Sequence, residues 1–185
     1  RGTFVHRNLL NNNHRGIVLQ SGATGNQIVE NQITENISYG VQVDGAQTIE
    51  NTISRNYFRD SNFRAIALLN GGNKTIEPPV VNKLQWEVNN IAGTCNAPDG
   101  SSVEVYALDR ELVQYRLIAA CRVFGKSFSA SGRVEDGESV CALVIHPDGN
   151  TSEIGPSYLS ESFSGAQSPF VYSARVRGDL DIFLQ

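Results

Sequence analysis

The sequence feature that most constrains the fold is an internal repeat in residues 1–76. Three stretches can be laid over one another: VHRNLLNNN followed by GIVLQSG, IVENQITEN followed by GVQVDGA, and IENTISRN followed by AIALLNGG. The period is 20 to 25 residues, which is typical of architectures in which each unit packs only on its neighbours. We therefore expect a stack of similar units in this half of the chain.

Each unit is built from short strands. Apolar and polar residues alternate, as in Val41-Gln42-Val43, and no apolar stripe with helical spacing is sustained. A leucine-rich repeat has a similar period, but it needs several leucines per unit and usually a helical segment. Because the turns between the strands are rich in Asn and Gly, we expect each strand to pair with its equivalent one coil away. The repeat predicts a parallel β-solenoid of about three coils.

Asparagine is enriched, with 17 residues in all and 12 of them before position 75. Coils of a parallel stack lie about 4.8 Å apart, so equivalent Asn side chains can exchange amide hydrogen bonds and tolerate the left-handed backbone of a bend. We expect two Asn columns, Asn8/Asn31/Asn51 and Asn13/Asn36/Asn56. The expected inward apolar columns are Leu10/Ile33/Ile53, Ile17/Val41/Ile66 and Leu19/Val43/Leu68.

The pattern changes after residue 77. The segments Asn70-Gly71-Gly72-Asn73 and Pro78-Pro79 end the repeat, because paired prolines cannot donate to a strand ladder. From Val80 onward, longer strands are separated by the turn dipeptides Asp99-Gly100, Asp136-Gly137 and Asp148-Gly149. We predict an all-β chain with three parts: β-helix coils at 1–77, an antiparallel β-sandwich at 78–158, and a strand-forming tail at 159–185.

Two resemblances follow from these motifs. With N-x-I/L-x-x-N followed by G-I/V-x-V/L, residues 1–76 resemble the last coils of a right-handed β-helix of the pectate-lyase-like type, found in secreted bacterial proteins. Residues 80–156 resemble a bacterial immunoglobulin-like module, through Gly93-Thr94, the strand 103–106 (VEVY) and the motif 149–153 (GNTSE). The first resemblance implies a fold and an extracellular or cell-surface location, but it leaves the activity open because that fold hosts lyases, hydrolases, epimerases and adhesins.

In pectate-lyase-like enzymes the acid and the base lie on the outward face of a stacked sheet. Among the outward positions here, Asp44 is the only carboxylate, whereas a glycosidase needs two about 5 to 9.5 Å apart. We therefore expect no catalytic residue. Asp44-Gly45 is a turn dipeptide, which favours a turn or surface role over a ligand contact. Arg55, Arg59 and Arg64 cluster around the last coil and form either an anion site or a solvated edge. The candidate ligand contacts are Gln42, Asp44, Arg59 and Arg64.

The histidines and cysteines do not predict a metal site. His6, His14 and His146 are scattered, and motifs for metals, nucleotides or serine nucleophiles are missing, so we expect no metal and no cofactor. The three cysteines fit one disulfide plus one thiol in an exported protein. Each of the three pairings is open, and Cys121–Cys141 is favoured because we expect these residues on neighbouring strands of one sheet.

Composition and charge exclude two classes of function, nucleic-acid binding and membrane insertion. The net charge of −4 gives no basic excess for nucleic acid, and no apolar run reaches the length of a membrane span. The leading hypothesis is a secreted, non-catalytic protein of the cell surface with a structural, adhesive or self-assembling role. Such a protein could be the subunit of a filament or of a surface layer. The alternative is the C-terminal part of a polysaccharide lyase or hydrolase whose catalytic coils precede Arg1. Expected partners are an extracellular polysaccharide and further copies of the chain. Residues 166–185 either fold back as an additional hairpin, which is favoured, or join copies head to tail.

Overall fold

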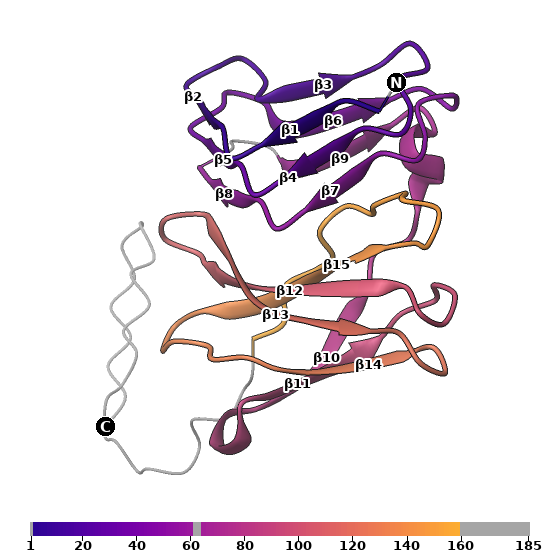
Figure 1. The fold of residues 1–185 in the computed structure, drawn as a ribbon. Helices are drawn as coiled ribbons and strands as arrows, with labels where there is room; N and C mark the ends of the chain where they lie inside the picture. The colour runs from indigo at the N-terminus through magenta and orange to yellow at the C-terminus, as the bar shows by residue number, and fades with distance from the viewer. Residues whose placement is uncertain (1, 61–63, 160–185) are drawn as a thin grey trace, which may run out of the picture.

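The computed structural model describes residues 2–60 and 64–159, so the predicted tail at 159–185 lies outside the described residues except for its first residue. Figure 1 shows two parts stacked on each other, a set of parallel coils and an antiparallel β-sandwich beneath it. Helical structure in the described part is confined to two short 3-10 helices, η1 (Gly72–Thr75) and η2 (Trp86–Val88). The predicted all-β fold, a short parallel β-helix followed by an antiparallel sandwich, is confirmed.

Each coil carries three short strands that pair in parallel with their equivalents in the next coil. The three resulting sheets are β1-β4-β7, β2-β5-β8 and β3-β6-β9. The strands are β1 (Phe4–His6), β2 (Leu9–Asn11), β3 (Ile17–Leu19), β4 (Gln27–Val29), β5 (Gln32–Thr34), β6 (Tyr39–Asp44), β7 (Thr52–Ser54), β8 (Tyr57–Arg59) and β9 (Arg64–Leu69).

The register corrects the expected columns of the third coil. Leu9, Gln32 and Tyr57 are partners, so Asn56 rather than Asn51 continues the column of Asn8 and Asn31. Within a coil, a three-residue strand and two corner residues repeat every five positions. An alignment of the third repeat that is shifted by one strand therefore matches the first two repeats almost as well. The same shift affects the apolar columns, which are Leu10/Ile33/Phe58 and Val5/Ile28/Ile53. The columns Ile17/Val41/Ile66 and Leu19/Val43/Leu68 are confirmed.

The asparagines form hydrogen-bonded ladders in this corrected register. The Asn31 Oδ1 atom accepts the backbone N–H of Asn8 at 2.9 Å, and the Asn56 Oδ1 atom accepts that of Asn31 at 2.9 Å. The side-chain amides also bond from coil to coil, at 3.1 and 3.0 Å. Further ladders are Asn26/Asn51/Asn73 and Asn13/Asn36. The ladders therefore tie each corner to the corner of the next coil.

The left-handed residue of the first corner is the one before the ladder asparagine. Arg7, Glu30 and Arg55 have φ values of 54°, 54° and 53° and occupy equivalent places in the three coils. Asn8, Asn31 and Asn56 themselves are not among the positive-φ residues. The expectation that these asparagines adopt the bend conformation is therefore wrong, because their amides are used to bridge coils and the preceding residue makes the bend.

The sandwich contains two antiparallel sheets. The smaller sheet has the order β10-β11-β14, and the strands β15, β12 and β13 join β8, β5 and β2 in one six-stranded sheet. The join is the antiparallel pairing of Gln114 with Arg59 and of Tyr115 with Phe58. The strands are β10 (Val80–Gln85), β11 (Asn90–Thr94), β12 (Ser102–Asp109), β13 (Gln114–Arg122), β14 (Ser127–Ser131) and β15 (Ser139–Ile145).

Side chains of the sandwich cap the backbone of the last coil. The Thr151 Oγ1 atom accepts the N–H of Ile53 at 2.9 Å, and the Asn150 Oδ1 atom accepts that of Glu50 at 2.6 Å. Two carboxylates act in the same way: Glu104 accepts the N–H of Arg55 at 2.9 Å, and Glu153 accepts the N–H of Leu68 at 2.8 Å. The sandwich thus supplies the acceptors that a further coil would supply.

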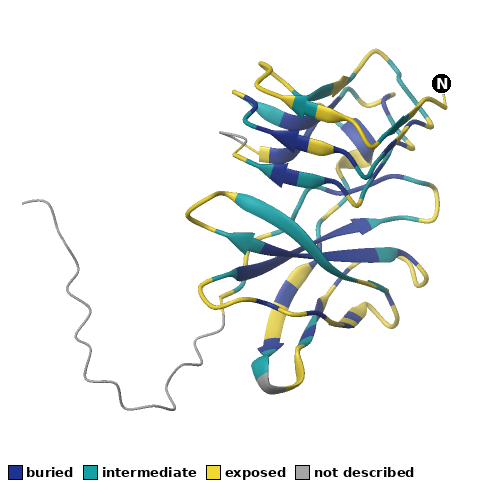
Figure 2. Ribbon diagram, turned by 60° about the vertical axis from the view of Figure 1, so that its left-hand side comes forward, coloured by how far each residue is buried: buried dark blue, intermediate teal, exposed yellow. Residues whose placement is uncertain are grey.

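The apolar interior of the coils also continues into the sandwich. Tyr106, Cys141 and Leu143 are buried in the same cluster as Ile53 and Phe58 of the last coil. A second cluster lies between the two sheets of the sandwich. Both faces of β12 and β15 are therefore covered, and Figure 2 shows these central strands buried along most of their length.

The ladder predicts a measurable stability loss for Asn31→Ala. The change leaves the backbone N–H of Asn8 without its acceptor and removes the side-chain bond from Asn31 to Asn56, so the free energy of unfolding should fall by about 1–3 kcal/mol. Chemical denaturation checks this value, with Asn82→Ala on the exposed side of β10 as the control. A loss as small as that of the control would contradict the ladder.

The cap predicts that Thr151→Val destabilises the whole chain. Valine keeps the shape of threonine but offers no acceptor to the buried N–H of Ile53, so we expect a loss of about 1–3 kcal/mol in the free energy of unfolding. Thr3→Val, at an exposed position of the first coil, is the matched control. Equal denaturation midpoints for both variants would show that the cap bond contributes nothing.

Candidate functional site

The outer face of the β3-β6-β9 sheet carries three of the four candidate ligand contacts. Val41 and Val43 point into the coil, so Gln42 and Asp44 point outward from β6. In the next coil Gln42 pairs with Ala67 and Asp44 with Leu69. Arg64 begins β9 on the same sheet. We refer to this outer surface of β6 and β9 as the first face.

Asp44 is the centre of a chain of polar side chains on the first face. Its Oδ2 atom accepts the Nε2–H of Gln42 at 3.2 Å, and its Oδ1 atom accepts the Nδ2–H of Asn70 at 2.8 Å. Its backbone carbonyl accepts the Thr48 hydroxyl at 2.7 Å, ahead of Gly45 at φ 98°. The turn expected at Asp44-Gly45 is present, but the carboxylate also has a fixed orientation.

Gln42 has an unsatisfied acceptor next to this carboxylate. The residue is only 4% exposed, and its Oε1 atom has no donor among the described residues. An unpaired buried carbonyl of this kind costs about 1–3 kcal/mol. The Oε1 atom is itself buried, so Gln42 contributes its Nε2 bond to Asp44 rather than an open acceptor on the first face.

Arg64 borders a small cavity on the first face. The cavity has a volume of about 220 Å³ and is lined by Tyr39, Arg64, Ala67 and Leu69. The Nη1 atom of Arg64 donates to both oxygens of Glu153, at 2.8 and 3.0 Å. The positive charge of Arg64 is therefore balanced, while the bonds to Glu153 use Nη1 and leave Nε and Nη2 for another acceptor.

The arginines expected to cluster are paired separately. Arg59 lies on β8, on a different sheet from Arg64, and it forms an ion pair with Glu35. Arg55 lies 3.9 Å from a carboxylate oxygen of Glu30. Of the two alternatives for these arginines, a shared anion site is disfavoured, because the three side chains pair with different carboxylates.

The favoured disulfide is also wrong. Cys121 on β13 is opposite Val103, and Cys141 on β15 is opposite Tyr106, so β12 lies between the two cysteines. They also belong to different cores, and all three cysteines are free. Burial raises the pKa of Cys141 to about 12 and that of Cys95 and Cys121 above its usual value. The cysteines are thiols at neutral pH.

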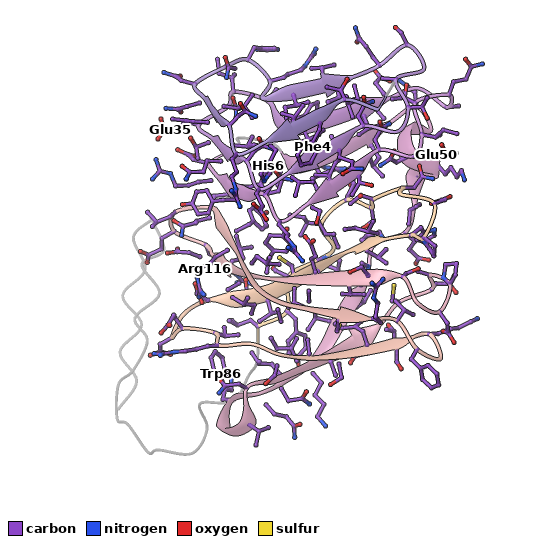
Figure 3. All side chains as sticks on the ribbon, viewed as in Figure 1. Phe4, His6, Glu35, Glu50, Trp86 and Arg116 are labelled. Carbon is purple, nitrogen blue, oxygen red and sulfur yellow. The ribbon has the colours of Figure 1, made fainter. Side chains whose placement is uncertain are left out.

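The histidines are not arranged to bind a metal. His6 stacks on Phe4 with ring centroids 4.9 Å apart (Figure 3), and its Nε2 atom lies 3.0 Å from Glu30. Hydrogen bonds from His6 and Arg7 lower the pKa of Glu30, so this carboxylate is already paired. Over residues 2–60 and 64–159, no three His, Cys, Asp or Glu side chains are grouped as a metal site.

Asn36, Asn73 and Asn150 each begin an N-x-S/T motif, the acceptor sequence of N-glycosylation, and all three have structural roles. Asn36 and Asn73 are ladder members, and Asn150 caps the last coil. Each is at most 1% exposed. The sequons at these positions therefore do not present acceptor nitrogens to an enzyme in the folded chain.

No curated protein matches the chain. A family model with the description periplasmic copper-binding protein (NosD) matches residues 2–95, which is half of the chain and includes all three coils. Copper prefers imidazole and sulfur ligands, and the chain has no methionine and only the separate histidines and the buried or half-buried thiols described above. These residues do not fit a copper ion.

None of the helices in the described ranges could span a membrane. From its matched coils, the chain belongs to the NosD family of periplasmic β-helix proteins.

Proposed function

We propose that the chain is a non-catalytic glycan-binding protein that acts outside the cytoplasm, with the first face as its binding site. The observation that carries this proposal is the chain Gln42–Asp44–Asn70 beside the cavity at Arg64. A periplasmic family and the parallel coils support the location.

The chemistry of the first face suits a sugar. A carboxylate held by two amides accepts hydroxyl hydrogens. Arg64 can donate to a ring or hydroxyl oxygen, while the Tyr39 ring and Leu69 offer apolar surface to the C–H groups of a sugar. A volume of about 220 Å³ suits one sugar unit of a longer chain.

The same face is poorly equipped for hydrolysis. Glycosidases use two carboxylates across the scissile bond, and Asp44 is the one outward carboxylate of the described strands β3, β6 and β9. Glu153, the acid of the cap that contacts Arg64, is held by that arginine and by the N–H of Leu68. Asp44 therefore acts as an acceptor for hydroxyl groups in this proposal. The alternative, catalytic coils before Arg1, concerns residues outside this chain and stays a prediction.

An immunoglobulin-like sandwich and an adhesive role at the cell surface extend this proposal. The GNTSE motif supports an immunoglobulin-like assignment for the sandwich, and an adhesive role at the cell surface would follow from glycan binding. Head-to-tail assembly into a filament or surface layer depends on residues 166–185, which lie outside the described residues. It stays a prediction.

Glycan binding should depend on Asp44. We expect galactomannan and hydroxyethylcellulose, which are neutral, to bind better than alginate and polygalacturonate, because the Asp44 carboxylate repels an anionic chain. Asp44→Asn should weaken binding about 10-fold, since a hydrogen bond to a charged group contributes about 1.5–3 kcal/mol. Affinity electrophoresis measures this, with Asp60→Asn at an exposed corner of the third coil as the control. Failure to bind any of the four polymers would refute the proposal.

No cleavage should accompany binding. After long incubation with each of the four polymers, we expect no new reducing ends and no unsaturated products, because the first face lacks a second carboxylate. Reducing-end assays and absorbance of unsaturated sugars are the measurements. Product release that disappears in Asp44→Asn would show that the first face is catalytic.

A further inference from the structure

We propose that a second face of the coils binds another strand of neutral polysaccharide, so that one molecule bridges two glycan strands. This second face is the outer surface of the β2-β5-β8 sheet. The ligand class rests on the proposed function, but the site is independent of the first face. Variants of each face test binding at the first face and binding at the second face separately.

The second face is a groove built from two columns of side chains. It has a volume of about 440 Å³. The strand register places Leu9, Gln32 and Tyr57 in one column and Asn11, Thr34 and Arg59 in the other. Because these residues alternate with the inward Leu10, Ile33 and Phe58 columns, the same two columns recur in every coil.

The groove offers polar groups of the kind that sugars bind. Gln32 is exposed, and neither its amide nor the Tyr57 hydroxyl bonds to another described residue. The Thr34 hydroxyl donates to the Asn11 Oδ1 atom at 3.2 Å, which orients that amide and leaves its Nδ2 donors without a partner among the described residues. Tyr57 is half-buried, so its ring has a fixed place on which a sugar can stack.

The charges of the groove balance. Arg59, the one cation in the two columns, forms its ion pair with Glu35 at the edge of the groove. A neutral ligand can bind without breaking this ion pair. An anionic polymer would have to compete with Glu35 for the guanidinium of Arg59. Binding that depends on amides, a hydroxyl and an aromatic ring should also change little with salt.

The shape of the groove favours a polymer over a single small molecule. Successive coils lie about 4.8 Å apart, so each column offers a new side chain at a regular step along the coil stack. The floor also continues beyond the last coil, because Arg59 pairs with Gln114 of β13 in the cap. A linear chain can therefore follow the groove from the coils toward the sandwich.

The two faces point in different directions. Figure 1 places β2, β5 and β8 along one side of the stack and β3, β6 and β9 along another. The corner with the Asn13/Asn36 ladder lies between them. A polymer strand on one face therefore does not block the other face, and simultaneous binding of two strands is geometrically allowed.

The first test asks whether the second face binds on its own. In an Asp44→Asn background, Gln32→Ala/Tyr57→Ala should weaken binding to galactomannan by a further 10-fold or more, and Gln32→Ala alone should weaken it several-fold without a change in melting temperature. Gln27→Ala is the matched control, since it is exposed in the same coil but lies on the β1-β4-β7 sheet. If Asp44→Asn alone abolishes all binding, the second face is not a site, while the proposed function of the first face stands.

The second test asks for bridging. Beads coated with galactomannan are saturated with protein, washed, and offered fluorescein-labelled galactomannan fragments, with the protein confirmed as a monomer by light scattering. Wild type and Gln27→Ala should capture the fragments, whereas Asp44→Asn and Gln32→Ala should each retain less than a third of that capture. Capture by Gln32→Ala equal to wild type, or failure of wild type to capture fragments, would overturn the bridging inference.

Discussion

The hydrogen bonds that cover the last coil are the constraint on which the rest of the structure depends. A parallel coil satisfies its backbone only against a neighbour, so the final coil would leave a row of N–H groups unpaired. Four side chains of the sandwich accept these groups, and β13 pairs directly with β8. Three of the four, Asn150, Thr151 and Glu153, come from one five-residue motif. The sandwich is thus an end cap for the β-helix.

This cap explains why the two parts share a core. The strands β12 and β15 face the coils on one side and the smaller sheet on the other, so both sides of each strand are apolar. The continuous run SVCALVI of β15 follows from this double coverage rather than from the alternation of a half-exposed strand. Glu104 is buried in the same junction, where it accepts the Tyr106 hydroxyl at 2.7 Å and the N–H of Arg55. Removing either part would expose the core of the other.

The cap also affects the candidate binding faces. Glu153 joins the backbone of Leu68 to the guanidinium of Arg64, so the cap holds one wall of the first cavity. The second face continues into β13 through Arg59 and Gln114. Both faces therefore lie on strands that are held in place by the asparagine ladders between coils and by the sandwich at the end of the stack. Rigid presentation of this kind lowers the entropic cost of binding a flexible polymer.

The sequence by itself determined the coils. Its period, the alternation within each unit and the recurring asparagines specify short parallel strands, since local periodicity decides which residues point inward. It also placed Gln42 and Asp44 outward on one face. The five-residue spacing between corner asparagines made the third coil ambiguous by one strand. Only the tertiary structure decided that Asn56 rather than Asn51 continues the first ladder, that Arg59 and Arg64 belong to different faces, and that β12 separates Cys121 from Cys141. The role of the GNTSE motif as a cap was decided there too. These features depend on pairings between residues far apart in the chain, such as Ile53 with Thr151, and local periodicity carries no information about such pairings.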